Sequence, residues 1–247
     1  MDLGLAGRCA AVAGASAGLG FASARALAAE GVRVAICGRD ADRLADAAAR
    51  IDGAVAIPAD VSTVEGATRF VGEATDALGR LDILVPNAGG PPPGTFSSTA
   101  LEAYAPALEL NLLSTVAMCH AAVPSMCERG WGRVVAITSI AVREPIPTLI
   151  LSNTARAGVT GFLKTLAGEV ASRGVTVNSV QPGLHATDRL VQLHGGDPSD
   201  AAAQTPTGTL GDPDDFGAVV AFLCSDHARF ITGAAIPVDG GAHRGLQ

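Results

Sequence analysis

Aromatic residues and lysine are scarce in this chain of 247 residues: aromatics make up 4 %, and Lys164 is the one lysine beside sixteen arginines. Because few bulky rings are available, the core must come from small and aliphatic side chains, which let helices lie close to a sheet. Hydrophobic residues reach 48 % and charged residues only 17 %, which excludes a disordered chain. The net charge of −7 and the lack of a basic patch argue against nucleic acid as a partner.

The chain also lacks paired cysteines and long apolar runs. Its five cysteines show no CxxC spacing, which argues against a disulfide framework or a zinc site and is typical of reduced thiols in a cytoplasm. Gly, Pro or a charged residue breaks every apolar run before about 18 residues. We therefore expect a cytoplasmic protein without a metal site or a membrane-spanning segment.

Short β-rich segments alternate with Ala-rich helical segments. We expect strands at residues 9–13, 32–37, 54–57, 82–85, 133–138, 175–180 and 235–238. We expect helices at residues 18–30, 40–50, 62–78, 99–128, 151–172 and 212–225. Asp40 is placed to cap the second helix, and Ser62 with Glu65 forms a capping-box pattern at the third.

This alternation predicts an α/β fold: one doubly wound, Rossmann-type parallel sheet of about seven strands with helices on both faces. Residues 1–247 then form a single domain. The segment 184–210 is irregular and polar, which predicts a lid over the substrate.

A glycine-rich turn lies between the first predicted strand and the first predicted helix. It contains Gly14, Ser16, Gly18, Leu19 and Gly20. Glycines there let the backbone approach a pyrophosphate, and the helix N-terminus offers free N–H groups and a positive dipole end. The GxxxGxG spacing differs from the commonest dinucleotide fingerprint, and taken alone it also fits a tight turn. Its strand–turn–helix context predicts a dinucleotide site.

Further motifs follow in order along the chain: Asp60-Val61, Asn87-Ala88-Gly89, Asn111, Ser139, Pro182-Gly183 with Thr187, and Ile231-Thr232-Gly233 before Val238-Asp239-Gly240-Gly241. With the glycine turn, they resemble the short-chain dehydrogenase/reductase family over some 230 residues. The resemblance implies that Asp60 and Val61 contact the adenine and that residues 87–89 line the cofactor cleft. It also implies that Pro182, Gly183 and Thr187 meet the nicotinamide.

The residues after the second strand bear on the choice of cofactor. An acid at the end of this strand would accept hydrogen bonds from a ribose 2′-hydroxyl and repel a 2′-phosphate. The chain has Gly38 there, followed by Arg39, whose guanidinium could hold a phosphate. We therefore expect NADP(H) to be favoured over NAD(H), although Arg39 could also be a solvated residue at a helix start.

The resemblance breaks at the catalytic residues. The family combines a serine and a helix asparagine, matched here by Ser139 and Asn111, with a Tyr-x-x-x-Lys on the next helix. Thirteen residues beyond Ser139 stands Ser152, and four further stands Arg156, so the tyrosine and the lysine are both replaced. The one tyrosine and the one lysine of the chain form no such pair elsewhere.

These replacements change the available chemistry. A serine hydroxyl is a far weaker acid than tyrosine, and the pKa of arginine, near 12.5 or above, leaves it little use in proton exchange. Losing a positioned general acid slows a reaction by about 10²–10⁴-fold, so hydride transfer is slowed but not forbidden. Arg156 could anchor the nicotinamide ribose and place positive charge near a developing alkoxide. His185 is a substitute proton carrier or else a solvent-facing loop residue, and His194 and Glu144 are weaker candidates.

Three functions therefore stay open. The first, which we favour, is an NADP(H)-dependent oxidoreductase acting on a small-molecule carbonyl/alcohol pair with a non-standard proton donor. The second is a cofactor-binding subunit without activity that partners an active relative. The third is a non-redox enzyme that uses Ser139, Ser152 and Arg156 as an oxyanion site. We expect a homodimer or homotetramer, or a hetero-oligomer with an active relative.

Overall fold

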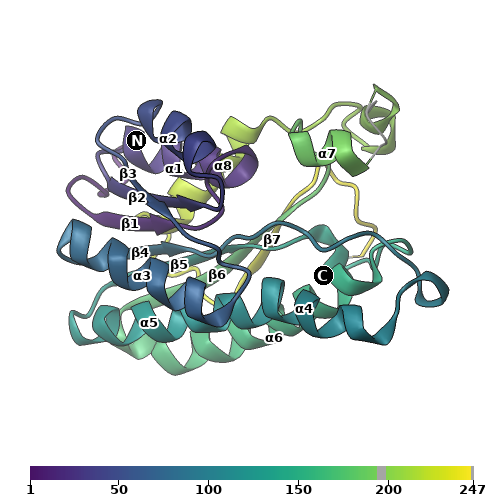
Figure 1. Cartoon of the computed structure of the whole chain (residues 1–247). Helices are drawn as coiled ribbons and strands as arrows, with labels where there is room; N and C mark the ends of the chain where they lie inside the picture. Colours follow the sequence, from purple (N-terminus) through teal and green to yellow (C-terminus); the bar gives the residue numbers. More distant parts are fainter. Residues whose placement is uncertain (194–198, 246–247) are drawn as a thin grey trace.

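Seven parallel strands form one sheet in the computed structural model, which describes residues 1–193 and 199–245 (Figure 1). The strands are β1 (Cys9–Val12), β2 (Arg33–Gly38), β3 (Val55–Pro58), β4 (Ile83–Val85), β5 (Gly132–Ile137), β6 (Val175–Pro182) and β7 (Ala235–Val238). Their order in the sheet is β3-β2-β1-β4-β5-β6-β7. The order reverses between β1 and β4, so the predicted doubly wound fold is confirmed.

Helices cover both faces of this sheet (Figure 1). One layer holds α1 (Gly18–Ala29), α2 (Ala41–Ala49) and α8 (Pro213–Cys224), and the other holds α3 (Val64–Leu78), α4 (Tyr104–Leu108), α5 (Ser114–Glu128) and α6 (Ile150–Val170). Short 3₁₀ turns lie at Phe96–Ser98, Leu101–Ala103, Ile140–Val142, Ala171–Arg173 and Ser199–Gln204. The helix α7 (Asp188–Leu193) follows β6 and stands apart from both layers (Figure 1).

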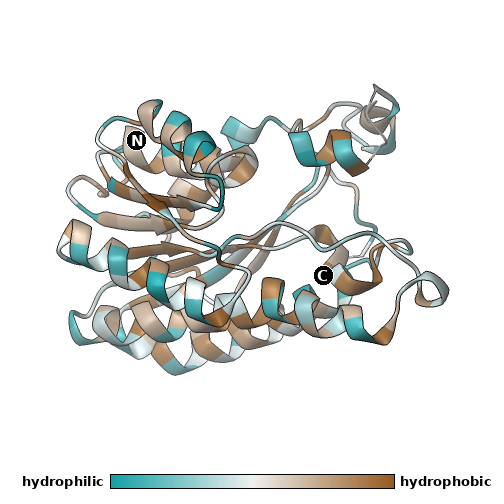
Figure 2. Ribbon diagram, viewed as in Figure 1, coloured by the Kyte–Doolittle hydropathy of each residue, from teal (hydrophilic) through white to brown (hydrophobic). Residues whose placement is uncertain are grey.

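Small and aliphatic side chains fill the space between the sheet and each helical layer. The central strands β1, β4 and β5 are buried along their whole lengths, as strands of a sheet covered on both faces must be. Figure 2 shows hydrophobic residues along these strands and on the helix faces beside them. The two fully buried phenylalanines, Phe70 and Phe216, lie on opposite sides of the sheet.

One of the two predicted helix caps is present in the structure. Asp40 caps α2, because its carboxylate accepts a hydrogen bond from the Arg43 backbone N–H at 3.0 Å. The predicted Ser62 capping box is wrong: Thr63 caps α3 instead and accepts from the Gly66 N–H at 3.1 Å. Ser62 donates its own backbone N–H to the Asp60 carboxylate at 3.0 Å, and this turn shifts the helix start by one residue.

The predicted helix over residues 99–128 is divided into shorter pieces. A π-helical turn at Glu109–Leu113 joins α4 to α5 and contains the buried Asn111. Among the described residues, Leu101–Glu128 is the one helical stretch that is long and apolar enough to suit a membrane span. Its apolar window of 18 residues has a mean hydropathy of 1.3, and 56 % of that window is buried inside the protein. Packing against α3, α6 and the sheet accounts for its apolar character.

The sequence predicts an irregular segment over residues 184–210, and this prediction is wrong in part. It contains α7 and the 3₁₀ turn Ser199–Gln204, while residues 194–198 lie outside the described chain. Its first residues lie next to the carboxyl ends of the strands, where the site is found.

Candidate functional site

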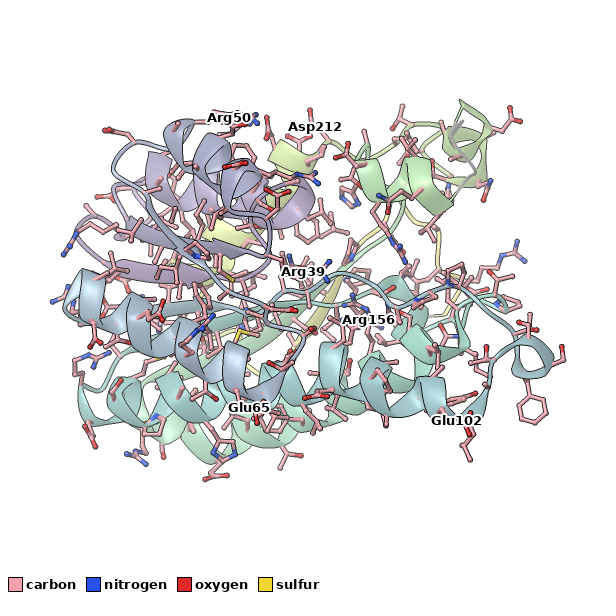
Figure 3. All side chains as sticks on the ribbon, in the orientation of Figure 1. Arg39, Arg50, Glu65, Glu102, Arg156 and Asp212 are labelled. Carbon is pink, nitrogen blue, oxygen red and sulfur yellow. The ribbon has the colours of Figure 1, made fainter. Side chains whose placement is uncertain are left out.

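The loops that follow β1, β4, β5 and β6 line a cavity of about 540 Å³ at the carboxyl edge of the sheet. Because the strand order reverses between β1 and β4, the loops of the two halves diverge there and leave a crevice. Helix α7 forms a further wall. Figure 3 shows Arg39 and Arg156 in this central region, with Glu65 and Glu102 on helices away from it.

The glycine turn brings the start of α1 close to the cavity. Gly14 and Gly18 have φ angles of +56° and +58°, which glycine adopts readily. A Cβ on Gly20 would lie 2.5 Å from the Gly14 carbonyl oxygen, so the close approach of α1 requires glycine there. Within the described chain, no side chain caps α1 and no acid lies in its first turn. The helix therefore presents free N–H groups and a positive end, which suits a phosphate.

Two asparagines hold the segment after β4. Asn87 Nδ2 donates to the carbonyl oxygens of Ala13 (3.2 Å) and Gly14 (3.1 Å). Asn111 Nδ2 donates to the Gly89 carbonyl oxygen at 2.9 Å. Asn111 is not on the cavity wall, and its buried Oδ1 has no hydrogen-bond partner in the part of the chain that the structure describes. Asn111 therefore acts on the cavity through the backbone at Gly89.

The end of β2 forms the other side of the crevice. A Cβ on Gly38 would lie 3.0 Å from Ser16, so the two residues pack closely, and Arg39 lies exposed on the cavity wall. Burial acts to raise the pKa of Asp60, but hydrogen bonds from Ser62 and the charge of Arg39 outweigh it and hold the pKa below its ordinary value. Asp60 is thus a carboxylate near Arg39 rather than a wall of the cavity.

Two serines line the cavity beside the end of β5. Ser139 follows this strand, and its Oγ accepts a hydrogen bond from the Ala141 N–H at 3.1 Å, so its own hydrogen is free for donation. Ser152 lies in the first turn of α6 and is buried, and its hydroxyl makes no hydrogen bond with any residue in the described ranges. Both hydroxyls are available to an oxygen atom in the cavity.

Arg156 lies one turn beyond Ser152 on α6 and is also buried. Its Nη1 donates to the carbonyl oxygens of Ile137 (3.2 Å) and Thr138 (2.9 Å). Burial, and to a lesser degree the charge of Arg189, lowers the pKa of Arg156 to about 10. The guanidinium is therefore still a cation at neutral pH.

His185 lies on the cavity wall but is 5 % exposed, so the solvent-facing alternative is wrong. Its ring packs edge-on against Phe216, with centroids 5.1 Å apart, and a Cβ on Gly211 would lie 2.6 Å from it. Nδ1 lies 3.3 Å from the Gly183 carbonyl oxygen, which can only accept, so Nδ1 carries the hydrogen. Burial lowers the pKa of His185, which disfavours its protonated form at neutral pH.

The cavity wall contains most of the residues singled out from the sequence: Gly14, Gly18, Leu19, Arg39, Asn87, Ala88, Gly89, Ser139, Ser152, Arg156, Pro182, Gly183, His185 and Thr187. The remaining candidates in the described chain lie off this wall: Ser16, Gly20, Asp60, Val61, Asn111 and Glu144. Val61 is buried in the core beside α3, and exposed Glu144 accepts from the Arg244 backbone N–H at 3.1 Å. His194 lies outside the described residues.

Three charged residues on the wall were missed by sequence reasoning: Arg43, Asp188 and Arg189. Arg43 Nη2 and Asp188 Oδ2 form an ion pair at 2.8 Å between α2 and α7. Arg43 lies in the first turn of α2, and Arg39 lies just before the Asp40 cap of that helix. Nothing in the sequence pairs Arg43 with Asp188. No group of three His, Cys, Asp or Glu side chains that could hold a metal ion lies in the described chain.

The chain is similar to known oxidoreductases. Residues 14–243 match a family model described as enoyl-(acyl carrier protein) reductase. A 3-oxoacyl-[acyl-carrier-protein] reductase of Synechocystis sp. is 35 % identical over 244 residues, 96 % of this chain and 97 % of that protein. A 2-dehydro-3-deoxy-L-rhamnonate dehydrogenase (NAD(+)) of Sphingomonas sp. is 32 % identical over 96 % of this chain and 95 % of that protein.

Among solved structures, L-sorbose reductase from Gluconobacter frateurii, complexed with NADPH and L-sorbose, superposes with a TM-score of 0.92. It is 32 % identical, and the match covers 100 % of both chains. The family model, the relatives and the shared fold lead to one conclusion: this chain belongs to the short-chain dehydrogenase/reductase family of oxidoreductases.

Proposed function

We propose that this protein is an NADP(H)-dependent oxidoreductase of a carbonyl/alcohol pair, with Ser152 and Arg156 in place of the usual tyrosine and lysine. The observation that carries the proposal is one cavity lined by the uncapped start of α1, by Ser139 and Ser152, and by the buried Arg156. The similar proteins include an NADPH-bound reductase and an NAD(+)-dependent dehydrogenase, so the choice of cofactor rests on this chain's own residues.

The residues present fit NADP(H). The free N–H groups at the start of α1 would hold the pyrophosphate, and the exposed Arg39 would bind the 2′-phosphate through its planar fork. Arg156 would hold the nicotinamide ribose from the opposite wall. When bound, NADPH supplies the hydride and its two electrons.

The chain's own side chains act on the substrate oxygen. Ser139 and Ser152 donate hydrogen bonds to it, and the positive charge of Arg156 stabilises the negative charge that develops there. The proton that the oxygen gains comes from solvent through the Ser152 hydroxyl, because serine is itself a weak acid. We expect slow chemistry, about 10²–10⁴-fold below what a tyrosine donor would support.

Turnover by the purified protein tests the proposal. NADPH absorbance is followed with a panel of aldehydes and ketones, and NADPH binding is measured by calorimetry. Ser139→Ala should lower kcat by about 10²–10³-fold, because the substrate oxygen loses a positioned donor. NADPH affinity should stay within about twofold, since Ser139 does not hold the phosphates.

Ser172→Ala, which removes a hydroxyl from the exposed turn Ala171–Arg173, is the matched control and should leave both readouts unchanged. Tight NADPH binding without turnover of any carbonyl would contradict the proposal and favour the non-catalytic subunit. The relatives named above carry oxidoreductase names and give that alternative no support.

A further inference from the structure

Arg156 is a buried cation without an anionic partner. It is 9 % exposed, and only Nη1 is used, by the two carbonyl oxygens at the end of β5. Within the described ranges, Nε and Nη2 make no hydrogen bond. The guanidinium also forms no ion pair there. Burying an unpaired charge is costly unless something neutralises it. The free N–H groups of Arg156 therefore mark a place for an anion.

A second cation lies near the first. Arg189 lies in the first turn of α7, half-buried on the cavity wall, and its Nη2 donates to the Pro91 carbonyl oxygen at 3.1 Å. A Cβ on Gly90 would lie 2.8 Å from that Nη2, so the side chain crosses the crevice to the segment after β4. Both arginines line the same cavity, and the charge of Arg189 acts to lower the pKa of Arg156. Two like charges thus share one cavity.

The described cavity wall offers these cations no carboxylate. Its one acidic side chain is Asp188, which pairs with Arg43 at 2.8 Å. Arg39 and Arg43 belong to the β2–α2 side, whereas Arg156 and Arg189 belong to α6 and α7. The wall therefore carries a second, separate excess of positive charge.

In the proposed placement the cofactor brings no phosphate to Arg156. Its phosphates belong at the start of α1 and at Arg39, whereas Arg156 lies beside Ser152 at the nicotinamide end. The ribose at that end is neutral, and the oxidised nicotinamide carries a positive charge. The substrate is then the ligand that can bring an anion to Arg156.

Resting on the proposed function, we propose that the substrate is a keto acid, or its hydroxy acid in the reverse direction. Its carboxylate binds Arg189 and one of the two free nitrogens of Arg156, and the other is left for the nicotinamide ribose. A carboxylate offers two oxygens that match the guanidinium fork. Ile137, Leu149 and Leu193 line the cavity as apolar contacts for a short carbon chain.

The reaction leaves the carboxylate unchanged. The hydride forms a bond to the carbonyl carbon, the C=O π bond breaks, and its oxygen takes up one proton to give the hydroxyl. NADPH becomes NADP⁺. Since Arg189 is part of α7, binding of the carboxylate also fixes this helix over the substrate.

The experiment compares 2-oxobutanoate and 3-oxobutanoate with their methyl esters, which differ from the acids mainly in lacking the charge. Each is tested for turnover with NADPH and for calorimetric binding to the protein saturated with NADP⁺. We expect the better acid to exceed its ester about 10- to 100-fold in kcat/KM and in affinity, the range of a charge-assisted hydrogen bond.

Arg189→Gln keeps a donor for the Pro91 carbonyl oxygen but removes one of the two positive charges. The acid preference should therefore fall several-fold, with the remainder due to Arg156, while NADPH affinity is unchanged. Arg189→Lys should restore part of the preference. Arg173→Gln removes the same charge from an exposed turn at the opposite end of β6 and should change neither quantity.

The proposal would be overturned if esters were bound and used as well as acids, or if Arg189→Gln left the acid preference at its wild-type value. It would also fall if Arg189→Gln weakened NADPH binding but kept the acid preference, because the guanidinium would then serve the cofactor's phosphates. Turnover of neutral carbonyls without acid preference would leave the proposed function standing alone. Arg189-dependent acid binding without turnover would contradict the proposed function and support this site, and neither binding nor turnover would overturn both.

Discussion

Arg39 is the residue on which we expect the choice of cofactor to depend. It lies exposed beside the crevice, while Gly38 before it is packed against Ser16 and has no side chain to repel a 2′-phosphate. We predict that NADPH binds at least several-fold tighter than NADH and that Arg39→Asp reverses the order, because a carboxylate repels phosphate and accepts from a ribose hydroxyl.

Calorimetric titration with both cofactors checks this prediction, and Arg173→Asp at an exposed position is the charge control. Equal affinities that Arg39→Asp leaves unchanged would contradict it.

His185 gives a prediction on stability rather than on catalysis. Burial lowers its pKa, and the Gly183 carbonyl oxygen and Asp212 oppose this effect only in part. The unfolded chain therefore binds a proton more readily than the folded one. The stability that the neutral ring contributes is complete above pH 6.5 and is lost as the pH falls through the folded-state pKa.

We expect the free energy of unfolding to fall as the pH drops below about 6.5, and His185→Gln to flatten this fall. Urea unfolding across that range is the measurement, with the exposed His120→Gln as control. Identical slopes for wild type and His185→Gln would argue against a buried neutral ring. If His185 also takes part in proton transfer, the inflection in the pH dependence of kcat would lie below pH 6.5, because the pKa of His185 is lowered.

At the scale of elements, the position of α1 depends on one close backbone contact. Gly20→Ala would place a Cβ 2.5 Å from the Gly14 carbonyl oxygen, so the helix start must move. We predict a loss of about 1–3 kcal/mol in the free energy of unfolding, the usual range for overpacking. NADPH should also bind at least about tenfold more weakly, because the N–H groups that face its pyrophosphate are displaced.

Gly72→Ala is the matched control, since Gly72 lies inside α3 with open space at its Cβ position. It should stabilise the protein by about 0.5–1 kcal/mol. Urea unfolding and calorimetry measure both variants, and a Gly20→Ala protein that keeps wild-type affinity would show that α1 does not hold the cofactor.

Helix α7 is attached to both sides of the crevice by two adjacent residues. Asp188 pairs with Arg43 on α2, and Arg189 donates to the Pro91 carbonyl oxygen in the segment after β4. The ion pair is exposed on both sides, and such pairs contribute about 0–1 kcal/mol, so this attachment can open readily. The lid over the substrate stays a prediction.

For the whole molecule, assembly and location stay predictions. We expect a homodimer or homotetramer in the cytoplasm, or a complex with an active relative. Apolar side chains remain on the surface of the isolated chain, Phe230 among them at 99 % exposed. Sedimentation of the purified protein should give two or four times 24.6 kDa, and a monomer at all concentrations would contradict the homo-oligomer.

The sequence by itself determined the order of strands and helices, the single doubly wound sheet and the glycine turn. These features can be predicted locally, since the periodicity of hydrophobic residues and the positive φ angles of glycine are properties of short segments. Counting from Ser139 also located Ser152 and Arg156, because an unbroken strand–loop–helix unit keeps its spacing.

Only the tertiary structure decided the rest. It buried His185 against Phe216, used Asn111 to hold Gly89, and brought Arg43 to Asp188, 145 residues away. It also placed Arg189 and Arg156 on one cavity wall, where the one described carboxylate, Asp188, pairs with Arg43. Contacts of this kind depend on the path of the whole chain, because residues far apart in sequence meet only where the sheet order and the loops bring them together.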